Sequence, residues 1–379
     1  MDYSPFTMER WQSTYEHRVR FNLSESGVHP LSVSKLLELT DHGPEVLDIH
    51  LGYGQSNGSD ELRSRIAGLY QSTTEDSVLV TTGGAEANFV AFWHLLDPET
   101  PVAVMLPNYM QVPGLLKSFK SPILPYCLIE ENGWQPDLEA LKLCLQNGAR
   151  CILVTNPNNP TGATLSLESM SEIVKLAENY GAWILADEVY QGAEFEGEQT
   201  PSFWNQTDRI IVVNSLSKAY GLPGLRVGWI LAPPEIIESM WGRTDYTTIA
   251  PSSLSDTLAC IALQSSARQK IFSRTQCIIK ENFSLLAEWM ASEEDRYTYR
   301  RPDAGAICYV HYKTPINSTN FAQKLRKEMD ILVVPGDHFG MDNYLRLGFG
   351  LPPEELPEAL GRLAEAFNQV EAGLDSSIC

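Results

Sequence analysis

Short apolar runs recur between residues 46 and 274, and segments with helical periodicity separate them. The runs that predict strands most clearly are 77–80, 102–106, 152–155, 183–186, 210–213 and 227–231. Runs of this length between turn signals are typical of strands that are buried on both faces. Because such strands alternate with helices here, the pattern predicts a mostly parallel sheet covered by helices on both sides.

The pattern changes near residue 276. The elements predicted after this point are a helix through 283–290, strands around 306–310, 331–334 and 344–349, and an amphipathic helix over about 353–370. We therefore predict three parts, which are an N-terminal arm with part of a small domain (1–45), a large domain (46–275) and a small C-terminal domain (276–379).

The composition of the chain disfavours some classes of binding partner and some cellular compartments. The 379 residues include 28 Lys and Arg against 48 Asp and Glu, a formal net charge of -20. This charge disfavours nucleic acid and anionic membranes as partners, and no apolar stretch approaches the roughly 20 residues of a membrane span. The seven cysteines form no CxxC pair and no signal-peptide pattern is seen. We therefore expect a cytoplasmic protein with reduced thiols and no metal site.

The loop after the 210–213 run carries the strongest chemical signal. Lys218 lies in a Ser/Gly-rich segment there, and Ser215 and Arg226 flank it in the sequence. A lysine in such a loop suits an amine that forms a Schiff base with a cofactor aldehyde. Ser215 and Arg226 would then both reach a phosphate group. The alternative is a plain strand-to-loop junction with a solvated lysine.

Two other strand ends fit the same interpretation. Asp187 follows the 183–186 run, and a carboxylate in that place is costly unless it is paired. Its partner would be a protonated ring nitrogen, although a helix N-cap is an alternative role. Gly84 and Ala85 begin a helix directly after the 77–80 run. Backbone N–H groups at a glycine-rich helix start attract an anion, so both residues are predicted to bind the phosphate.

Together with Asn-Pro-Asn-Asn-Pro-Thr-Gly at 156–162 and Asp-Glu-Val-Tyr at 187–190, these motifs resemble the pyridoxal-phosphate (PLP) aminotransferases of fold type I. The resemblance extends from residue 24 to residue 350. It implies an α/β fold, with a large PLP-binding domain built on a mostly parallel sheet and a small C-terminal α/β domain. It also implies pyridoxal 5′-phosphate as cofactor, a small-molecule amino acid as substrate, and a homodimer with active sites at the interface.

The resemblance further implies roles for single residues around the cofactor. Lys218 would bind PLP covalently, and Asp187 would pair with its pyridine nitrogen. Asn159 and Tyr190 would contact its phenolic oxygen. Tyr109 would stack on the ring, although an ordinary core tyrosine is the alternative. Tyr53 would cross to the phosphate in the partner subunit, unless its Tyr-Gly loop is only a turn.

On the substrate side, Arg346 lies between apolar residues of a predicted strand. A guanidinium there suits bidentate capture of an α-carboxylate, and a structural ion pair is the alternative. The resemblance adds Gly27 and Asn159 as further substrate contacts.

A narrower resemblance concerns the reaction. Segments 26–29, 54–58, 217–229, 245–248 and 332–340 resemble the subgroup that closes hydroxylated arginines into cyclic guanidino amino acids. That subgroup includes capreomycidine synthases and the enduracididine-forming cyclases of guanitoxin biosynthesis. It implies conversion of γ-hydroxy-L-arginine to L-enduracididine by dehydration and intramolecular guanidine addition. The capreomycidine branch lacks the 156–162 and 187–190 motifs in the form seen here. An amino acid aminotransferase, or a capreomycidine-type cyclase acting on β-hydroxyarginine, therefore remains an alternative.

Two residues of the N-terminal arm are candidates for side-chain chemistry. Glu9 would hold the guanidinium or act as an acid or base, and a carboxylate matches that cation bidentately. His29 would assist the loss of water at Cγ. A solvated helix-face charge and an unreactive loop histidine are the alternatives. A regulator on a catalytically idle fold is a third hypothesis, which the retained lysine and the acidic charge disfavour.

Overall fold

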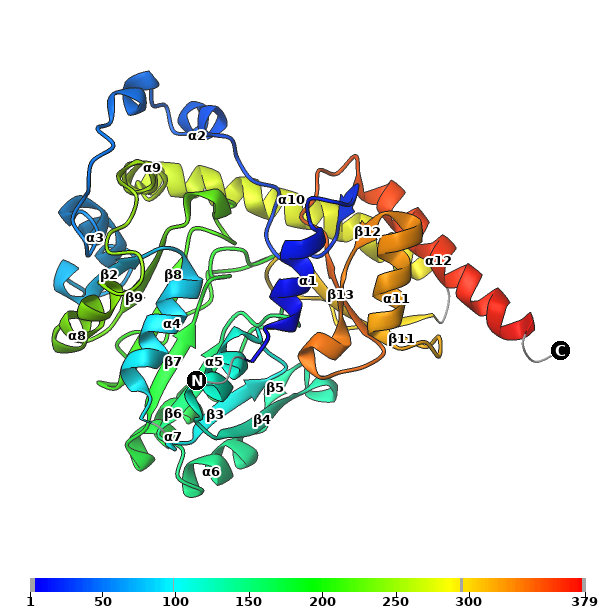
Figure 1. Ribbon diagram of the computed structural model, residues 1–379, viewed down its shortest axis with the longest axis horizontal. Coiled ribbons are helices and arrows are strands. Elements are labelled where there is room, and N and C mark those ends of the chain that lie inside the picture. The colour runs from blue at the N-terminus through cyan, green and yellow to red at the C-terminus, as the bar shows by residue number, and fades with distance from the viewer. Residues whose placement is uncertain (1–3, 98, 294–295, 377–379) are drawn as a thin grey trace.

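The computed structural model describes residues 4–97, 99–293 and 296–376 (Figure 1). Within these residues the larger sheet has eight strands in the order β2-β9-β8-β7-β6-β3-β4-β5. They are β2 (Val78–Thr81), β3 (Val102–Leu106), β4 (Ile123–Ile129), β5 (Gln135–Pro136), β6 (Cys151–Thr155), β7 (Trp183–Asp187), β8 (Ile210–Ser215) and β9 (Gly228–Leu231). Neighbours from β4 through β8 pair in parallel, whereas β9 runs antiparallel to β2 and β8, and β5 runs antiparallel to β4. The prediction of a mostly parallel sheet is confirmed.

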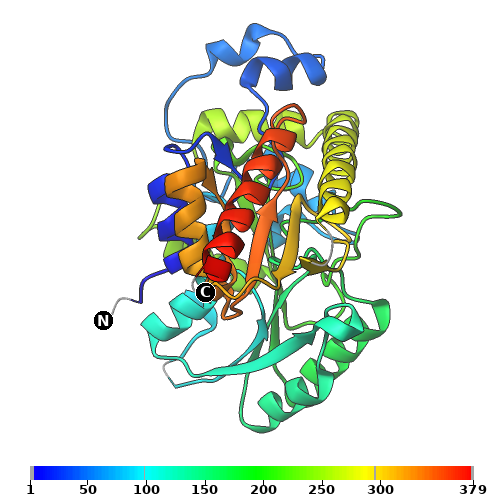
Figure 2. The ribbon, with the colours of Figure 1, turned by 90° about the vertical axis from the view of Figure 1, so that its right-hand side faces the viewer.

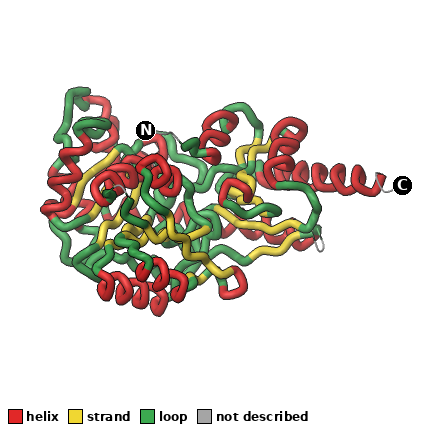
Figure 3. The backbone as a smooth tube through the Cα atoms, turned by 60° about the horizontal axis from the view of Figure 1, so that its bottom comes forward, coloured by secondary structure: helices red, strands yellow, loops and turns green. Residues whose placement is uncertain are grey.

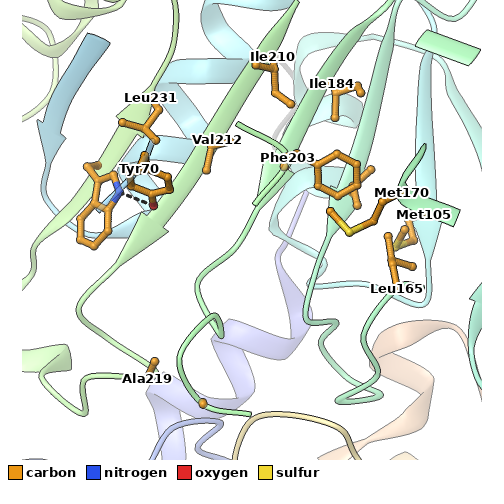
Figure 4. Close-up of a cluster of buried hydrophobic side chains, with 14 of the residues drawn as sticks. Tyr70, Met105, Leu165, Met170, Ile184, Phe203, Ile210, Val212, Ala219 and Leu231 are labelled. Atoms are coloured by element: carbon orange, nitrogen blue, oxygen red, sulfur yellow. Dashed lines mark hydrogen bonds between the residues drawn. The ribbon is translucent and has the colours of Figure 1, made fainter. Parts of the chain in front are cut away.

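Both faces of this sheet are buried. Ile210 and Val212 belong to one apolar cluster (Figure 4), while Ile211 and Val213 belong to another. Because successive side chains of a strand point to opposite faces, each cluster lies on its own face. Helices α3 (Asp60–Ala67), α6 (Leu138–Gln146), α7 (Leu167–Tyr180) and α9 (Ser253–Ala262) pack into the first cluster, and α4 (Gly84–Leu95), α5 (Gln111–Phe119) and α8 (Pro234–Thr244) into the second. The near-continuous apolar runs in the sequence therefore correctly indicated strands that are buried on both faces.

The smaller sheet is antiparallel, in the order β10-β11-β14-β13. Its strands are β10 (Tyr297–Tyr299), β11 (Ile307–Tyr312), β13 (Val334–Pro335) and β14 (Tyr344–Gly348), and the helices α11 (Ser318–Lys324) and α12 (Leu356–Ser376) pack against it (Figure 2). The long helix α10 (Ser265–Ser292) runs beside both sheets (Figure 1). The predicted boundary at 275 falls inside this helix, and the three-part division stays a prediction.

One predicted strand is divided into two short strands. The run at 331–334 breaks into β12 (Ile331–Leu332) and β13, because its two halves pair with different partners. β13 joins β14, whereas β12 pairs in parallel with β1 (Phe21–Asn22) near the N-terminus. An apolar run shows that residues are buried, but it does not show which strand they pair with.

The N-terminal segment contributes α1 (Thr7–Tyr15) and α2 (Val33–Leu39). Helix α1 lies between the two sheets (Figure 1), where Trp11 Nε1 donates to the carbonyl of Val333 at 2.9 Å. Gln12 Nε2 donates to the carbonyl of Ser24 at 2.7 Å, and the Arg326 guanidinium lies 4.1 Å from the centre of the Tyr15 ring. These contacts hold α1 in place beside a cavity, which part of the helix surface lines.

The remaining elements are short. The 3-10 turns are Pro44–Asp48, Glu75–Ser77, Glu130–Asn132, Pro223–Leu225 and Gly336–Phe339, and one π turn spans Leu325–Met329. The last turns of α12 extend beyond the body of the molecule (Figure 3). In the ranges given above, no helix has both the length and the apolar character needed to cross a bilayer.

Candidate active site

A cavity of about 470 Å³ opens where the strand ends of the larger sheet face α1 and the smaller sheet. The predicted site residues on its wall are Glu9, Gly84, Ala85, Tyr109, Asn159, Asp187, Tyr190, Ser215, Lys218, Arg226 and Arg346. Ligands of open α/β sheets bind outside the carboxyl ends of the strands, so this is the expected place for a site. The fold thus brings together motifs that lie up to 337 residues apart in the sequence.

Lys218 follows β8 and meets a carboxylate that the sequence did not indicate. Its Nζ lies 2.9 Å from Oε1 of Glu25, and the side chains are 25% and 42% exposed. Burial acts to raise the pKa of Glu25, but the Lys218 ammonium and the N–H groups of Ser26 and Gly27 outweigh it and lower the pKa to about 2. Burial acts to lower the pKa of Lys218, and the charge of Glu25 reverses this effect and raises it. The lysine of the predicted motif is therefore not a solvated surface charge.

Asp187 ends β7 and is 6% exposed. Asn88 Nδ2 donates to its Oδ2 at 3.0 Å, and the N–H of Val189 donates to its Oδ1 at 3.3 Å. Burial raises the pKa of Asp187, against the lowering effects of these two donors and of Lys218. The next element along the chain is β8, so Asp187 does not cap a helix. A buried carboxylate at a cavity wall suits a cationic partner inside the cavity.

The start of α4 forms a cradle with two polar side chains. Gly83 has a φ of +80°, and a Cβ there would overlap the guanidinium of Arg226. At Gly84 a Cβ would lie 3.8 Å from Oγ of Ser215. The guanidinium, the hydroxyl and the first N–H groups of α4 thus border one small space. Such a set of donors is suited to a phosphate group.

Arg346 stands in β14 and is only 1% exposed. Its Nη1 donates to Oδ1 of Asn159 at 2.9 Å, its Nη2 donates to the carbonyl of Ser24, and its Nε has no partner. None of the described residues forms an ion pair with it, which rules out the structural ion pair as its explanation. A buried guanidinium without a carboxylate is costly, so an anion in the cavity is the partner that it lacks.

The aromatic residue predicted to stack on a ring also lines the cavity. Tyr109 packs edge-on against Phe6, with ring centres 5.1 Å apart. Its hydroxyl donates to Oε2 of Glu9 at 3.3 Å. Tyr109 therefore connects the strand ends of the larger sheet to α1.

Three predicted residues are not on this wall. Gly27 packs behind the lysine loop, where a Cβ would lie 3.3 Å from the carbonyl of Ser217. His29 places its Nδ1 3.2 Å from the carbonyl of Gly350, and burial together with Arg274 lowers its pKa. Tyr53 is 91% exposed. The structure does not bring His29 or Tyr53 to the cavity of their own chain.

The wall also includes residues that the sequence did not indicate, among them Glu16, Glu25 and Asn88. Glu9, Gln12 and Glu16 have the spacing of one helix face, and all three line the cavity. That spacing could have revealed Glu16. Asn88 and Glu25 meet partners that are 99 and 193 residues away in the sequence, and no local pattern reports such contacts.

Comparisons with known proteins agree with this geometry. Residues 48–363 match the family model for aminotransferase class I and II. Capreomycidine synthase from Streptomyces vinaceus is 29% identical over 361 residues, which are 94% of this chain and 92% of that protein. A PLP-dependent aminotransferase from Streptococcus suis superposes with a TM-score of 0.91 at 31% identity, covering 98% and 99% of the two chains. The PLP-dependent cyclase OrfR gives a TM-score of 0.88 at 25% identity over 97% and 98%.

The cavity residues also fit the cofactor. The cradle at α4 suits a phosphate, Asp187 suits a protonated pyridine nitrogen, and the Lys218 amine suits an aldehyde. The predicted fold type I architecture and the predicted resemblance are both confirmed. The chain belongs to the aminotransferase class I and II family, and it is an enzyme whose cofactor is pyridoxal 5′-phosphate.

Proposed function

We propose that this enzyme is a cyclase that converts γ-hydroxy-L-arginine to L-enduracididine. The observation that carries the proposal is the acidic face of α1. Glu9 and Glu16 line the cavity, and among the described residues neither has a Lys or Arg partner. Two carboxylates without a Lys or Arg partner favour a substrate whose side chain is a cation.

The charged residues on the cavity wall also support a substrate with a cationic side chain. The basic residues on it are Lys218, Arg226 and Arg346, and the acidic ones are Glu9, Glu16, Glu25 and Asp187. We assign Arg226 to the cofactor phosphate, Arg346 to the α-carboxylate and Asp187 to the pyridine nitrogen. Lys218 and Glu25 pair with each other. The carboxylates of Glu9 and Glu16 are then left for the substrate side chain, and a guanidinium matches a carboxylate bidentately.

The likeness to capreomycidine synthase and to the cyclase OrfR favours ring closure over amino transfer. The Streptococcus suis aminotransferase, at 31% identity, supports the alternative of transamination. The charge pattern does not distinguish the two reactions, because both could act on a guanidino amino acid. A capreomycidine-type cyclase acting on β-hydroxyarginine is the other alternative.

In the proposed reaction, Arg346 holds the α-carboxylate and Lys218 takes the Cα proton. When bound, PLP supplies an electron sink for the charge left at Cα. A Cβ proton is then removed, the Cγ hydroxyl leaves as water, and a guanidine nitrogen bonds to Cγ. Protons return to Cβ and Cα. One nitrogen-bound hydrogen and the hydroxyl make the water, so no oxidant and no keto acid is needed.

Glu9 and Glu16 keep the guanidinium inside the cavity during these steps. His29 remains a candidate for assisting the loss of water, although it does not reach the cavity wall.

We also propose a cytoplasmic homodimer in which Tyr53 completes the partner's phosphate site. Mixing Tyr53→Phe with Lys218→Ala protein should then restore part of the activity, because one of the two sites of a mixed dimer carries neither change. Full activity in a demonstrated monomer would contradict this assembly.

The proposal is tested by incubating the holoenzyme with arginine, its β- and γ-hydroxy derivatives and common amino acids, with and without a keto acid. Mass spectrometry should find one product, from γ-hydroxy-L-arginine, lighter than the substrate by one water and formed without the keto acid. A keto product formed only when an amino acceptor is supplied would identify an aminotransferase instead. Ring closure of the β-hydroxy compound alone would identify the capreomycidine type.

A further inference from the structure

Glu25 stands beside the reactive lysine in a fixed position. Its Oε1 accepts from Lys218 Nζ at 2.9 Å, from the N–H of Ser26 at 2.8 Å and from the N–H of Gly27 at 3.1 Å. Three donors on one oxygen hold the carboxylate ionised and in one orientation.

The backbone that carries Glu25 is clamped to the smaller sheet. The N–H of Gly348 donates to the carbonyl of Leu23 at 2.7 Å, and Arg346 donates to the carbonyl of Ser24. A Cβ at Gly348 would overlap the carbonyl of Glu25, so only glycine permits this close approach. Glu25 is therefore preorganised, unlike the exposed Glu9 on α1.

We infer that Glu25 is a positioning residue for the chemistry at Lys218, where its charge stabilises the ammonium that forms when the amine takes the Cα proton. The inference rests on the proposed role of Lys218 as the cofactor lysine. It does not depend on which amino acid the enzyme accepts. A carboxylate that orients a catalytic base and stabilises its protonated form, without itself becoming protonated, is an established device in serine proteases.

The shift in the pKa of Glu25 distinguishes this positioning role from that of a general acid. The pKa of Glu25 is held near 2 by Lys218 and the two N–H groups despite burial, which acts to raise it. An efficient proton donor needs a pKa near the working pH, so a carboxylate whose pKa is lowered beside the Lys218 ammonium suits the role of an anion better than that of an acid. Glu25 also raises the pKa of Lys218 against the opposing effect of burial.

Other charged or titratable groups face Lys218 as well. They are Asp187 at the end of β7, Tyr190 in the turn that follows β7, and Arg346 in β14. Tyr190 raises the pKa of Lys218 and Arg346 lowers it. A substitution at Glu25 alone leaves all three groups in the sequence, so the comparison with the wild type reports on the charge of Glu25.

The test is a pH titration of cofactor absorbance in holoenzyme, which reports proton binding at the Lys218 nitrogen. Borohydride reduction and peptide mass spectrometry first establish that Lys218 carries the cofactor. Glu25→Gln keeps the size of the side chain and an oxygen for the two N–H groups but removes the charge. Because an anion favours the protonated nitrogen, its loss should lower the titration midpoint by about one to three pH units.

Glu16→Gln is the matched control, because it removes a carboxylate from the same wall without contact to Lys218, and its midpoint should equal that of the wild type. If Glu25→Gln does not fold, Glu25→Ala takes its place and should shift the midpoint in the same direction. An unshifted midpoint with the cofactor on Lys218 would overturn this inference and leave the proposed reaction intact. Cofactor found on another lysine would overturn the assignment of Lys218 and the inference together.

Discussion

The two walls of the cavity are built in different ways. On one wall, Asp187, Asn159 and Ser215 stand at or just after the ends of buried strands, and all three are themselves buried. On the other, Glu9 lies on the exposed face of α1, a helix of nine residues that side-chain contacts hold in place. The strand ends of the first wall are held by the hydrogen-bond ladder of the larger sheet. The second depends on contacts such as those of Trp11 and Gln12.

This difference separates two tasks. The strand-end wall suits the groups shared by every PLP reaction, which are the phosphate, the ring nitrogen and the aldehyde carbon. In the proposed function, the α1 wall binds the substrate side chain. Changes on α1 should therefore alter which amino acid binds while the cofactor stays in place, whereas changes on the other wall should stop all reactions alike.

The largest effect is expected at Lys218. Lys218→Ala removes both the attachment point of the cofactor and the base for Cα, so turnover should fall by more than about 1,000-fold. Borohydride should fix a pyridoxyl group on this residue in the wild type and on no residue of the variant. A pyridoxyl adduct on a different lysine of the wild type would refute the assignment.

A smaller but still large loss is expected at Arg346. Arg346→Gln removes the buried cation that we assign to the α-carboxylate, so amino acid binding should weaken by about 2–5 kcal/mol, or roughly 30- to several-thousand-fold. Titration of the cofactor absorbance with amino acid measures this effect. The absorbance of the holoenzyme before titration should match that of the wild type. Unchanged affinity would place the carboxylate elsewhere.

On the other wall, Glu9→Gln should act on charge selection alone. It removes one charged hydrogen bond to the guanidinium, which is worth about 1.5 kcal/mol, or roughly tenfold in affinity. The affinity for citrulline, a neutral analogue, should not change. An equal loss for arginine and citrulline would mean that Glu9 supports the shape of α1 and does not recognise charge.

The smallest effect is expected at Glu16, which follows the last turn of α1. Its side chain is 30% exposed, and His17 lies 3.6 Å away. Pairs that remain open to solvent contribute about 0.2–1 kcal/mol. Glu16→Gln should thus weaken the binding of arginine derivatives by about fivefold at most, a loss that added salt should mask. Isothermal titration at two ionic strengths tests this, and a loss larger than that of Glu9→Gln would reverse the order of the two carboxylates.

The same two walls explain what could be predicted from the sequence. Asp187, Ser215 and Lys218 lie at or near the ends of apolar runs, and strand ends of a parallel sheet gather at one edge. The pattern of apolar runs therefore predicted that these three residues lie together at one edge of the sheet. Glu25 lies in no helix or strand, and its contact with Lys218 arises only because the segment before Gly27 is clamped to β14. The pairing of β12 with β1 was missed for the same reason, since it joins residues about 310 apart.

We infer that the α1 wall selects a cationic side chain independently of the cofactor wall. The most direct test is the ratio of dissociation constants for citrulline and arginine, measured by cofactor absorbance in the wild type and in a Glu9→Gln, Glu16→Gln double variant. We expect the wild type to prefer arginine by at least about tenfold, and we expect the ratio to fall to near one in the double variant, with cofactor affinity unchanged. A preference that survives in the double variant, or its absence from the wild type, would show that the α1 wall does not select the charge of the side chain.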